Sequence, residues 1–350
     1  MTYNIKYVPA KDLERIQDEW KALETGEEMT LFQSYEWYQM LLEKYIPEDT
    51  KNFESVYAVV EANGKACMIA PLWIIKRSFR ILNKKGGYII GRFSFSDYLN
   101  FIYLTFDADA FDFLMKDLRR RYGIKKICFE DFRESTSIYQ HVIKSYSIIE
   151  NKKFPCVTLQ LPHTIEEYNK MLSKNSRQNL RTANNRLQKD GKTLIFNDDD
   201  QQVDRQECMR LREAKLSVQF SSVSKWRKYK YRIINHLRYS FPFFTPVTYY
   251  PHSKIMTAYD GQGKLRAFFN YAYDYNKKAI RIMAAGTDLD FARYSPGMLL
   301  MHQFIEKAIK QGQLEIVDFT RGDEPYKFAL GGNLCYNHKV IYKITYKKSL

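Results

Sequence analysis

The densest group of reactive side chains in this 350-residue sequence follows the apolar segment from Leu314 to Phe319, which we expect to be a strand. Residues 318 to 327 include three carboxylates, a phenol and two cations: Asp318, Asp323, Glu324, Tyr326, Arg321 and Lys327. A loop at the end of a strand is where catalytic and binding groups concentrate. A carboxylate here can accept a proton from an attacking ammonium, the phenol can return one to a leaving group, and the cations can orient a substrate. The same charges would alternatively form internal salt bridges that hold the loop in place.

The predicted helix before this strand offers a site for an anion. Ser295 is a good N-cap residue and Pro296 occupies the first helical position, so we expect a helix to begin there and to end at Gln311. The unpaired amides at such a helix start can bind phosphates. We therefore assign a diphosphate site to the helix start and one nearby cation, at Arg293, Ser295, Gly297 and Met298. An ordinary capped helix is the alternative interpretation.

Basic residues on an earlier predicted helix form a third candidate. Thr164, with Glu167 three residues later, is a capping box, and it opens a helical region that we expect to continue up to Gly191. Cations recur on one face of this region, at Lys170, Lys174, Arg177 and Arg181. We assign Arg177 and Arg181 to substrate binding, through phosphates of a donor or acceptor. A solvated charged face is the competing interpretation.

The first half of the sequence holds one weaker candidate. Asp97 and Tyr98 follow a strand-rich stretch, where they would line a cleft between the two halves and contact substrate. Packing and turn formation account for these two residues equally well.

The two halves of the chain have a similar order of predicted elements. In the first half two helices precede a strand-rich stretch with a hairpin turn at Asn63-Gly64, and a helix from Asp107 to Tyr122 and a last strand follow. In the second half the basic helical region precedes two more helices, the second from Lys225 to Tyr239, then three strands and the capped helix. We therefore predict an α/β protein with domains 1–155 and 156–350, each a mixed, mostly antiparallel sheet flanked by helices.

Lysine and arginine outnumber aspartate and glutamate by 55 to 40, which gives a formal charge of +15. This excess favours an anionic partner: a nucleotide cofactor, a nucleic acid or an acidic membrane surface. The five cysteines are scattered and the histidines show no ligand spacing, so we expect neither a disulfide framework nor a metal site. Apolar stretches fall far short of the roughly 20 residues of a spanning helix, and the N-terminus lacks signal-peptide features. We therefore expect a cytoplasmic protein.

Several of these segments together resemble the CelD-like acetyltransferases. This family belongs to the general-control-related N-acetyltransferase (GNAT) superfamily and is related to the Fem-type peptidoglycan aminoacyltransferases. The resemblance is carried by Tyr294–Gly297 with the following helix, and by Asp318–Lys327. The basic segment Leu172–Arg181 is similar to a helix of that family, and Phe32–Trp37 and Ser96–Tyr98 resemble its N-terminal features.

This resemblance implies tandem GNAT-like domains, an acyl-CoA donor such as acetyl-CoA bound by the second domain, and transfer of the acyl group to an amine. Family members often act in polysaccharide biosynthesis or on cell-envelope precursors, so an amino sugar or similar precursor is the expected acceptor. The sequence departs from the usual pyrophosphate loop, because three residues separate Arg293 from Gly297 and Met298 replaces the second small residue.

Two other functions stay open at this point. One is aminoacyl transfer from a charged tRNA, as in the Fem relatives, which suits the basic charge and the altered loop. The other is noncatalytic binding of a polyanion on a GNAT-like fold. Peripheral contact with a membrane and the oligomeric state stay open as well.

Overall fold

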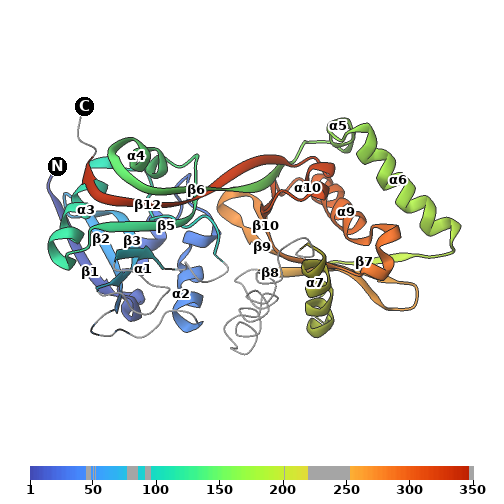
Figure 1. The fold of residues 1–350 in the computed structure, drawn as a ribbon, viewed down its shortest axis with the longest axis horizontal. Coiled ribbons are helices and arrows are strands. Elements are labelled where there is room, and N and C mark those ends of the chain that lie inside the picture. Colours follow the sequence, from blue (N-terminus) through green and yellow to red (C-terminus); the bar gives the residue numbers. More distant parts are fainter. Residues whose placement is uncertain are drawn as a thin grey trace. The chain divides into compact units, whose positions relative to one another are not determined.

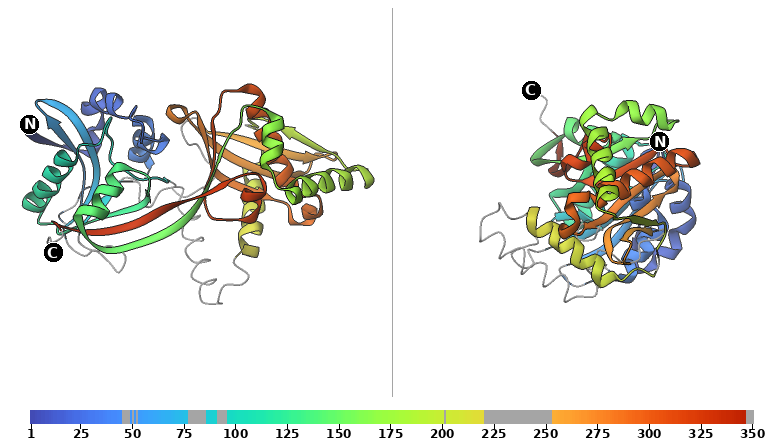
Figure 2. Two further views of the ribbon diagram at one scale, coloured as in Figure 1. Left: turned by 90° about the horizontal axis from the view of Figure 1, so that it is seen from above. Right: turned by 90° about the vertical axis from the view of Figure 1, so that its right-hand side faces the viewer.

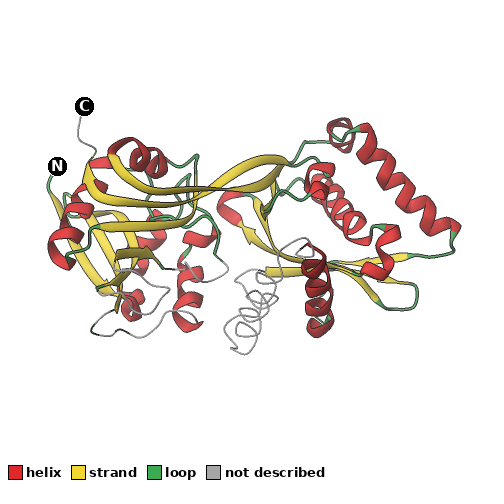
Figure 3. Ribbon diagram, in the orientation of Figure 1, coloured by secondary structure: helices red, strands yellow, loops and turns green. Residues whose placement is uncertain are grey.

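The computed structural model (Figure 1) describes most of the chain: residues 1–44, 49, 51, 53–76, 86–90, 96–200, 202–219 and 253–346. The helix predicted from Lys225 to Tyr239 lies outside these residues. The chain divides into two compact units, one of Met1–Pro155 with Tyr336–Leu350 and one of Cys156–Cys335. Each unit combines a sheet with flanking helices, as predicted (Figure 3). None of the helices within the described ranges is long and apolar enough to cross a bilayer.

The sheet of the first unit has the strand order β1-β2-β3-β4-β5-β12-β6. The strands are β1 (Tyr3–Pro9), β2 (Phe53–Ala62), β3 (Lys65–Ile75), β4 (Gly86–Ile89), β5 (Lys126–Arg133), β6 (Tyr146–Gln160) and β12 (Asn333–Tyr346). β4 and β5 are parallel, whereas the pairs β1-β2, β2-β3, β3-β4 and β5-β12 are antiparallel. The long strands β6 and β12 run side by side (Figure 2). The predicted hairpin turn joins β2 to β3, and both Asn63 and Gly64 have the positive φ that such a turn requires.

The first unit contains the helix that was predicted from Asp107 to Tyr122, which is α3 in the structure. The helical elements of this unit comprise short 3₁₀ turns η1 (Ala10–Ile16) and η2 (Leu31–Gln33) and helices α1 (Gln17–Leu23), α2 (Tyr35–Lys44), α3 (Ala108–Tyr122) and α4 (Ser137–Ser145). The Asp107 carboxylate caps α3 by accepting a hydrogen bond from the Ala110 amide at 3.0 Å. Gly123 ends the helix in the left-handed region. Local sequence therefore determines both ends of α3.

Aromatic side chains fill the core of the first unit. Trp20, Tyr38 and Tyr57 are fully buried, and their ring centroids lie 4.7 to 6.2 Å apart. The last part of the strand-rich stretch, residues 99–104, forms only an isolated bridge between Ile102 and Ile69.

The sheet of the second unit has the order β6-β11-β10-β9-β8-β7. Its other strands are β7 (Leu194–Asn197), β8 (Ser253–Asp260), β9 (Leu265–Asp274), β10 (Ala279–Thr287) and β11 (Ile316–Arg321). β10 and β11 are parallel, and β6-β11, β7-β8, β8-β9 and β9-β10 are antiparallel. β8, β9 and β10 are the predicted meander.

The helices of the second unit differ from the prediction at one break. They are α5 (Ile165–Met171), α6 (Lys174–Lys189), α7 (Arg205–Gln219), α9 (Pro296–Gln311) and α10 (Pro325–Ala329), with 3₁₀ turns η4 (Tyr275–Lys277) and η5 (Leu289–Tyr294). The capping box of Thr164 and Glu167 is present. The region predicted as one helix up to Gly191 is two helices, because Leu172 is extended and the Ser173 side chain caps α6.

α7 and α9 lie on opposite faces of this sheet, because consecutive residues of a strand point to opposite sides. Phe268 of β9 belongs to a core cluster with Leu211 of α7. Phe269 packs instead against Phe304 of α9, with ring centroids 5.4 Å apart. β9 and β10 are therefore covered on both sides, as suits a sheet that carries a site at its end.

β12 is absent from the predicted set of strands. Its residues Asn337–Lys343 pair with β5, and the chain after Cys335 belongs to the first unit. The sequence-based division assigned everything after residue 155 to the second domain. Val340, Tyr342 and Ile344 are buried at alternate positions, which is typical of a strand but does not reveal which sheet it joins.

Candidate active site

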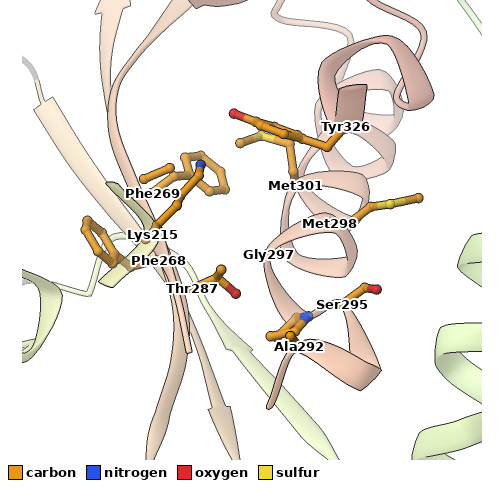
Figure 4. Close-up of a pocket in the computed structure, with 13 residues that line it drawn as sticks. Lys215, Phe268, Phe269, Thr287, Ala292, Ser295, Gly297, Met298, Met301 and Tyr326 are labelled. Atoms are coloured by element: carbon orange, nitrogen blue, oxygen red, sulfur yellow. The ribbon is translucent and has the colours of Figure 1, made fainter. Parts of the chain in front are cut away.

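A cavity of about 190 Å³ opens in the second unit between the sheet and the start of α9 (Figure 4). One wall comes from β9 and the end of β10, and the opposite wall comes from α9. The lining is chiefly apolar and includes Phe268, Phe269 and Met301. Four polar side chains complete it: Lys215 of α7, Thr287 of β10, Ser295 before α9 and Tyr326 of α10. Elements distant in the sequence therefore converge on one small space.

The cavity lies near the point where two parallel strands separate. β10 pairs with β11 only over Ala279–Arg281, opposite Ile316–Asp318. The register of β10 against β9 shifts between Ile282 and Ala284, so a β-bulge bends β10 here. Residues 285–287, at the end of β10, line the cavity. Backbone groups of strands that no longer pair with each other can bond a ligand instead.

Asp318, a predicted catalytic carboxylate, lies in a buried ion cluster. Arg281 is 1% exposed, and its Nη1 donates to Asp318 while its Nε and Nη2 donate to Asp274 at 3.2 and 2.7 Å. The other carboxylate oxygen of Asp318 accepts a hydrogen bond from the Thr320 amide at 2.8 Å. Asp318 is absent from the cavity lining. This arrangement gives Asp318 a structural role in holding β11 against β10.

The loop after β11 is tied together by the lysine predicted to bind substrate. Lys327 is 2% exposed, and its Nζ donates to the carbonyls of Arg321 and Gly322 at 2.7 and 3.1 Å. It also pairs with Glu324 at 2.9 Å. Burial alone would raise the pKa of Glu324, but the hydrogen bond and charge of Lys327 outweigh it and lower that pKa. Asp323 and Arg321 are exposed.

Tyr326 is the one predicted catalytic residue that lines the cavity. Its hydroxyl projects from the α10 side toward the sheet (Figure 4). Burial raises the pKa of the phenol far above its usual value, so it keeps its proton at neutral pH. Such a group can donate a hydrogen bond or a proton, but it does not act as a resident base.

The start of α9 forms the far end of the cavity. Helix α9 begins at Pro296 as predicted, and Ser295 occupies the N-cap position. The Ser295 side chain makes no capping bond, since the residue adopts the left-handed conformation with φ 49°. The amides of Ser295 and Met298 donate within the chain, to the carbonyls of Ala292 and Ser295. Gly297 is at the second helical position, where an amide has no partner inside the helix.

Cations lie near this helix start. The Arg293 side chain is 62% exposed and 3.4 Å from Asp190. Arg186 of α6 donates to the Arg293 carbonyl at 3.1 Å, a contact that sequence reasoning missed. A basic residue on a long polar helix carries no signal of this contact, because only tertiary packing brings α6 to η5. The arrangement offers two guanidinium groups close to the start of α9.

Among the exposed basic residues of α6, Arg177 has a structural role. Arg177 donates to the carbonyls of Asn169 and Leu172 at 2.8 and 2.6 Å, so it closes the end of α5. Lys174 and Arg181 are exposed. Helix α6 has no acidic residue between Lys174 and Lys189, which leaves a strongly positive surface.

Asp97 and Tyr98 lie in the first unit and are buried, with 6% and 2% exposure. The Gln33 amide donates to the Tyr98 carbonyl at 2.8 Å, and the Arg133 guanidinium lies over the Tyr98 ring at 4.6 Å. Tyr98 adopts a positive φ of 53°. These contacts agree with the packing and turn interpretation of Tyr98.

Lys215 is a protonatable cavity residue that the sequence did not single out. Its Nζ lies 4.9 Å from the ring centroid of Tyr326. Burial lowers the pKa of its amine, and the positive charges of Lys327 and Arg212 lower it further, whereas Glu324 opposes this shift. Helix α7 was predicted, but one lysine among its many charged residues has no local feature that marks it.

The described residues contain no group of three His, Cys, Asp or Glu side chains that could hold a metal ion. The cavity instead offers a helix start, a strand end and two protonatable groups, and the exposed Arg293 and Arg186 lie near the helix start outside the lining. Such a set can bind an anionic ligand and support proton transfer.

One segment of the chain matches a known family model, and the chain aligns with several solved structures. Residues 254–328, which include most of the cavity, match the family model of the acetyltransferase (GNAT) domain. No curated protein sequence gives a significant match. Among solved structures, FemX aligns with a TM-score of 0.56 at 10% identity, covering 96% of each chain.

Two further structures align over nearly the whole chain. A tandem GNAT protein from the clavulanic acid biosynthesis pathway has a TM-score of 0.46 at 10% identity, covering 99% of this chain and 100% of that one. The C-terminal domain of a putative lysylphosphatidylglycerol synthetase from Agrobacterium fabrum has a TM-score of 0.48 at 12% identity, covering 96% and 92%. The family-model match identifies a GNAT-type domain, and with it an enzyme of the acyltransferase class.

Proposed function

We propose that this protein is an N-acyltransferase that moves an acyl group from acyl-CoA to an amine. The observation that carries the proposal is the cavity at the separation of β10 and β11, with the start of α9 at one end and Tyr326 at the other. The cavity lies largely within the segment that matches the acetyltransferase (GNAT) domain. The resemblance of residues 318–327 to the CelD-like acetyltransferases supports the same reaction.

The donor would bind with its diphosphate at the start of α9. The helix dipole and the Gly297 amide favour negative charge there, and Arg293 and Arg186 add positive charge nearby. Phe269 and Met301 supply apolar contacts for the rest of the donor. Acyl-CoA thus enters as a substrate, and a cytoplasmic location would supply it.

Transfer would proceed directly between the two bound substrates. The amine attacks the thioester carbonyl carbon, the C–N bond forms, and the C–S bond breaks with the electron pair leaving on sulfur. Backbone amides near the bulge at Ala284 would stabilise the oxyanion, and Tyr326 would donate the proton to the departing thiolate. Asp323 and Glu324 remain proposed contributors to the loop chemistry, and Arg321 would orient the acceptor.

The acceptor would be an amino sugar or another amine-bearing precursor of a polysaccharide or of the cell envelope. An acceptor that carries phosphate fits the acid-free surface of α6, where Lys174 and Arg181 are exposed. Arg177 would contribute indirectly, because it orders the connection between α5 and α6.

A second candidate is aminoacyl transfer from charged tRNA. It is favoured by the fold likeness to FemX and by the same basic face of α6. Nucleic-acid binding of this kind weakens steeply with salt, since each phosphate contact releases counterions.

Titration calorimetry with two donors tests the proposal. We expect acetyl-CoA to bind, and a concentration a hundred times Kd to stabilise the fold by about 2.7 kcal/mol in a thermal-shift assay. Binding of tRNA that falls steeply between low and moderate salt, with no response to acetyl-CoA or longer acyl-CoA thioesters, would favour the second candidate.

A further inference from the structure

We infer that Lys215 is the proton acceptor of the transfer reaction, at the end of the cavity away from the start of α9. This inference rests on the proposed function. Helix α7 covers the opposite face of the sheet from α9, yet the Lys215 side chain reaches the cavity. In Figure 4 it extends beside Phe269 toward the wall from which Met301 and Tyr326 project. Ser295 and Gly297 lie at the other end of the same space.

The position of Lys215 along the cavity determines which part of the donor it would meet. With the diphosphate at the start of α9, the thioester end of the donor points toward Tyr326 and Lys215. The Lys215 amine stands 4.9 Å from the centre of the Tyr326 ring, so both protonatable groups lie at the end where acyl transfer takes place. General acid–base catalysis first requires that the acid and the base lie within reach of the reacting atoms, and only then that each has a suitable pKa.

The surroundings of Lys215 disfavour a charged amine in the empty site. Phe268, Phe269 and Met301 are its apolar neighbours in the cavity wall. Within the described part of the chain no carboxylate forms an ion pair with it, although the charge of Glu324 favours the protonated amine. A cation without a paired partner in apolar surroundings is destabilised relative to the neutral amine. The lowered pKa agrees with this geometry.

The charged groups that act on Lys215 come from two elements. Lys327 belongs to α10 and Glu324 is the residue before that helix, and the two pair with each other at 2.9 Å. Arg212 lies one turn earlier on α7 and adds positive charge. Tyr326 presents the face of a neutral phenol. Burial, together with the positive charges of Lys327 and Arg212, outweighs the charge of Glu324, so Lys215 releases a proton more readily than an exposed lysine does.

Two of the three carboxylates predicted as possible bases, Asp318 and Glu324, are engaged elsewhere, and the third, Asp323, is exposed. Asp318 is buried against Arg281, and Glu324 is held by Lys327 with a lowered pKa, which makes it a weaker base. Lys215 takes one proton from the acceptor ammonium and frees the lone pair that attacks the thioester carbon. After the C–N bond forms, Tyr326 donates its proton to the departing thiolate and the second proton of the nitrogen restores the phenol. Lys215 then returns its proton to solvent, so protons and charge balance.

Competitive labelling measures this property without knowledge of the acceptor. The folded protein is treated with trace isotopic acetic anhydride across a pH series, and peptides are quantified by mass spectrometry with Lys174 and Lys189 as exposed references. We expect Lys215 to reach half-maximal reactivity at a lower pH than the references, and unlabelled coenzyme A to protect it. A reactivity profile that matches the references, or no protection by coenzyme A that calorimetry shows to be bound, would overturn the inference. If coenzyme A and its thioesters do not bind at all, the proposed function fails instead.

Two variants separate a base from a simple positive charge. Lys215→Arg keeps the charge but cannot accept a proton near neutral pH, and Lys215→Met keeps the apolar stem. With glucosamine as acceptor probe, we expect both to lower kcat by roughly 10²-fold while the Kd for acetyl-CoA and the melting temperature stay near wild type or higher. Recovery of kcat in Lys215→Arg would identify electrostatic stabilisation and overturn the base role.

Discussion

Replacing Asp318 by asparagine distinguishes a structural carboxylate from a catalytic one. The asparagine oxygen can still accept the Thr320 amide bond. The charge opposite Arg281 is lost, and Asp274 remains as the partner of a guanidinium that is 1% exposed. A hydrogen bond to a charged group contributes about 1.5–3 kcal/mol. We therefore expect the second unit to lose about 2–3 kcal/mol of its free energy of unfolding.

This loss is large enough to measure directly. For a unit of this size each kcal/mol lowers Tm by about 2–4 °C, so the expected fall is roughly 4–12 °C. Circular dichroism melts should be recorded on the same preparations used for acetyl-CoA binding and turnover. Asp323→Asn is the matched control. Because Asp323 is exposed, this substitution should change the free energy of unfolding of the protein by no more than about 0.5 kcal/mol. An Asp318→Asn protein with unchanged Tm and a hundredfold loss of turnover per folded molecule would refute the structural interpretation.

Other substitutions test the remaining parts of the site. A Cβ at Gly297 would lie 3.5 Å from the Thr287 side chain, an ordinary contact, so Gly297→Ala should fold normally and weaken acetyl-CoA binding, as calorimetry can measure. Arg177→Ala should lower Tm because it removes two bonds to the end of α5, whereas Arg181→Ala should leave Tm unchanged and weaken a phosphate-bearing acceptor. The pKa of Lys215 is lower in the folded state than in the unfolded chain, so stability rises with pH between the two values. Lys215→Met should therefore raise Tm at pH 7, and it should reduce the increase of stability with pH. A lower Tm at pH 7 would contradict the argument that burial disfavours the charged amine.

Much of the local structure is readable from neighbouring residues. Asp107 and Gly123 bound α3, Pro296 begins α9, and Asn63-Gly64 forms the turn between β2 and β3. Each of these signals works through a hydrogen bond or a backbone dihedral angle within a few residues. The break between α5 and α6 escaped the prediction because the apolar periodicity continues across Ser173, while the hydroxyl of that serine starts a new helix.

Long-range pairing is less readable, because alternation of buried residues identifies a strand but not its partner. The burial pattern of β12 is that of an ordinary strand, yet its pairing with β5 assigns the end of the chain to the first unit. In the same way, the composition of the loop at residues 318–327 indicated chemistry but not the role of each side chain.

The sequence by itself determined that charged and protonatable groups concentrate after β11 and that a helix starts at Pro296, because both features are contiguous in the chain. Only the tertiary structure decided which of these groups make structural contacts and which line the cavity. Asp318 faces a buried Arg281 and Lys327 holds its own loop, whereas Tyr326 reaches the cavity. Lys215 joins Tyr326 there because the packing of α7 against β9 and β10 carries its side chain to the strand ends. A pKa shift and a cavity depend on neighbours supplied by other elements, so no local pattern encodes them.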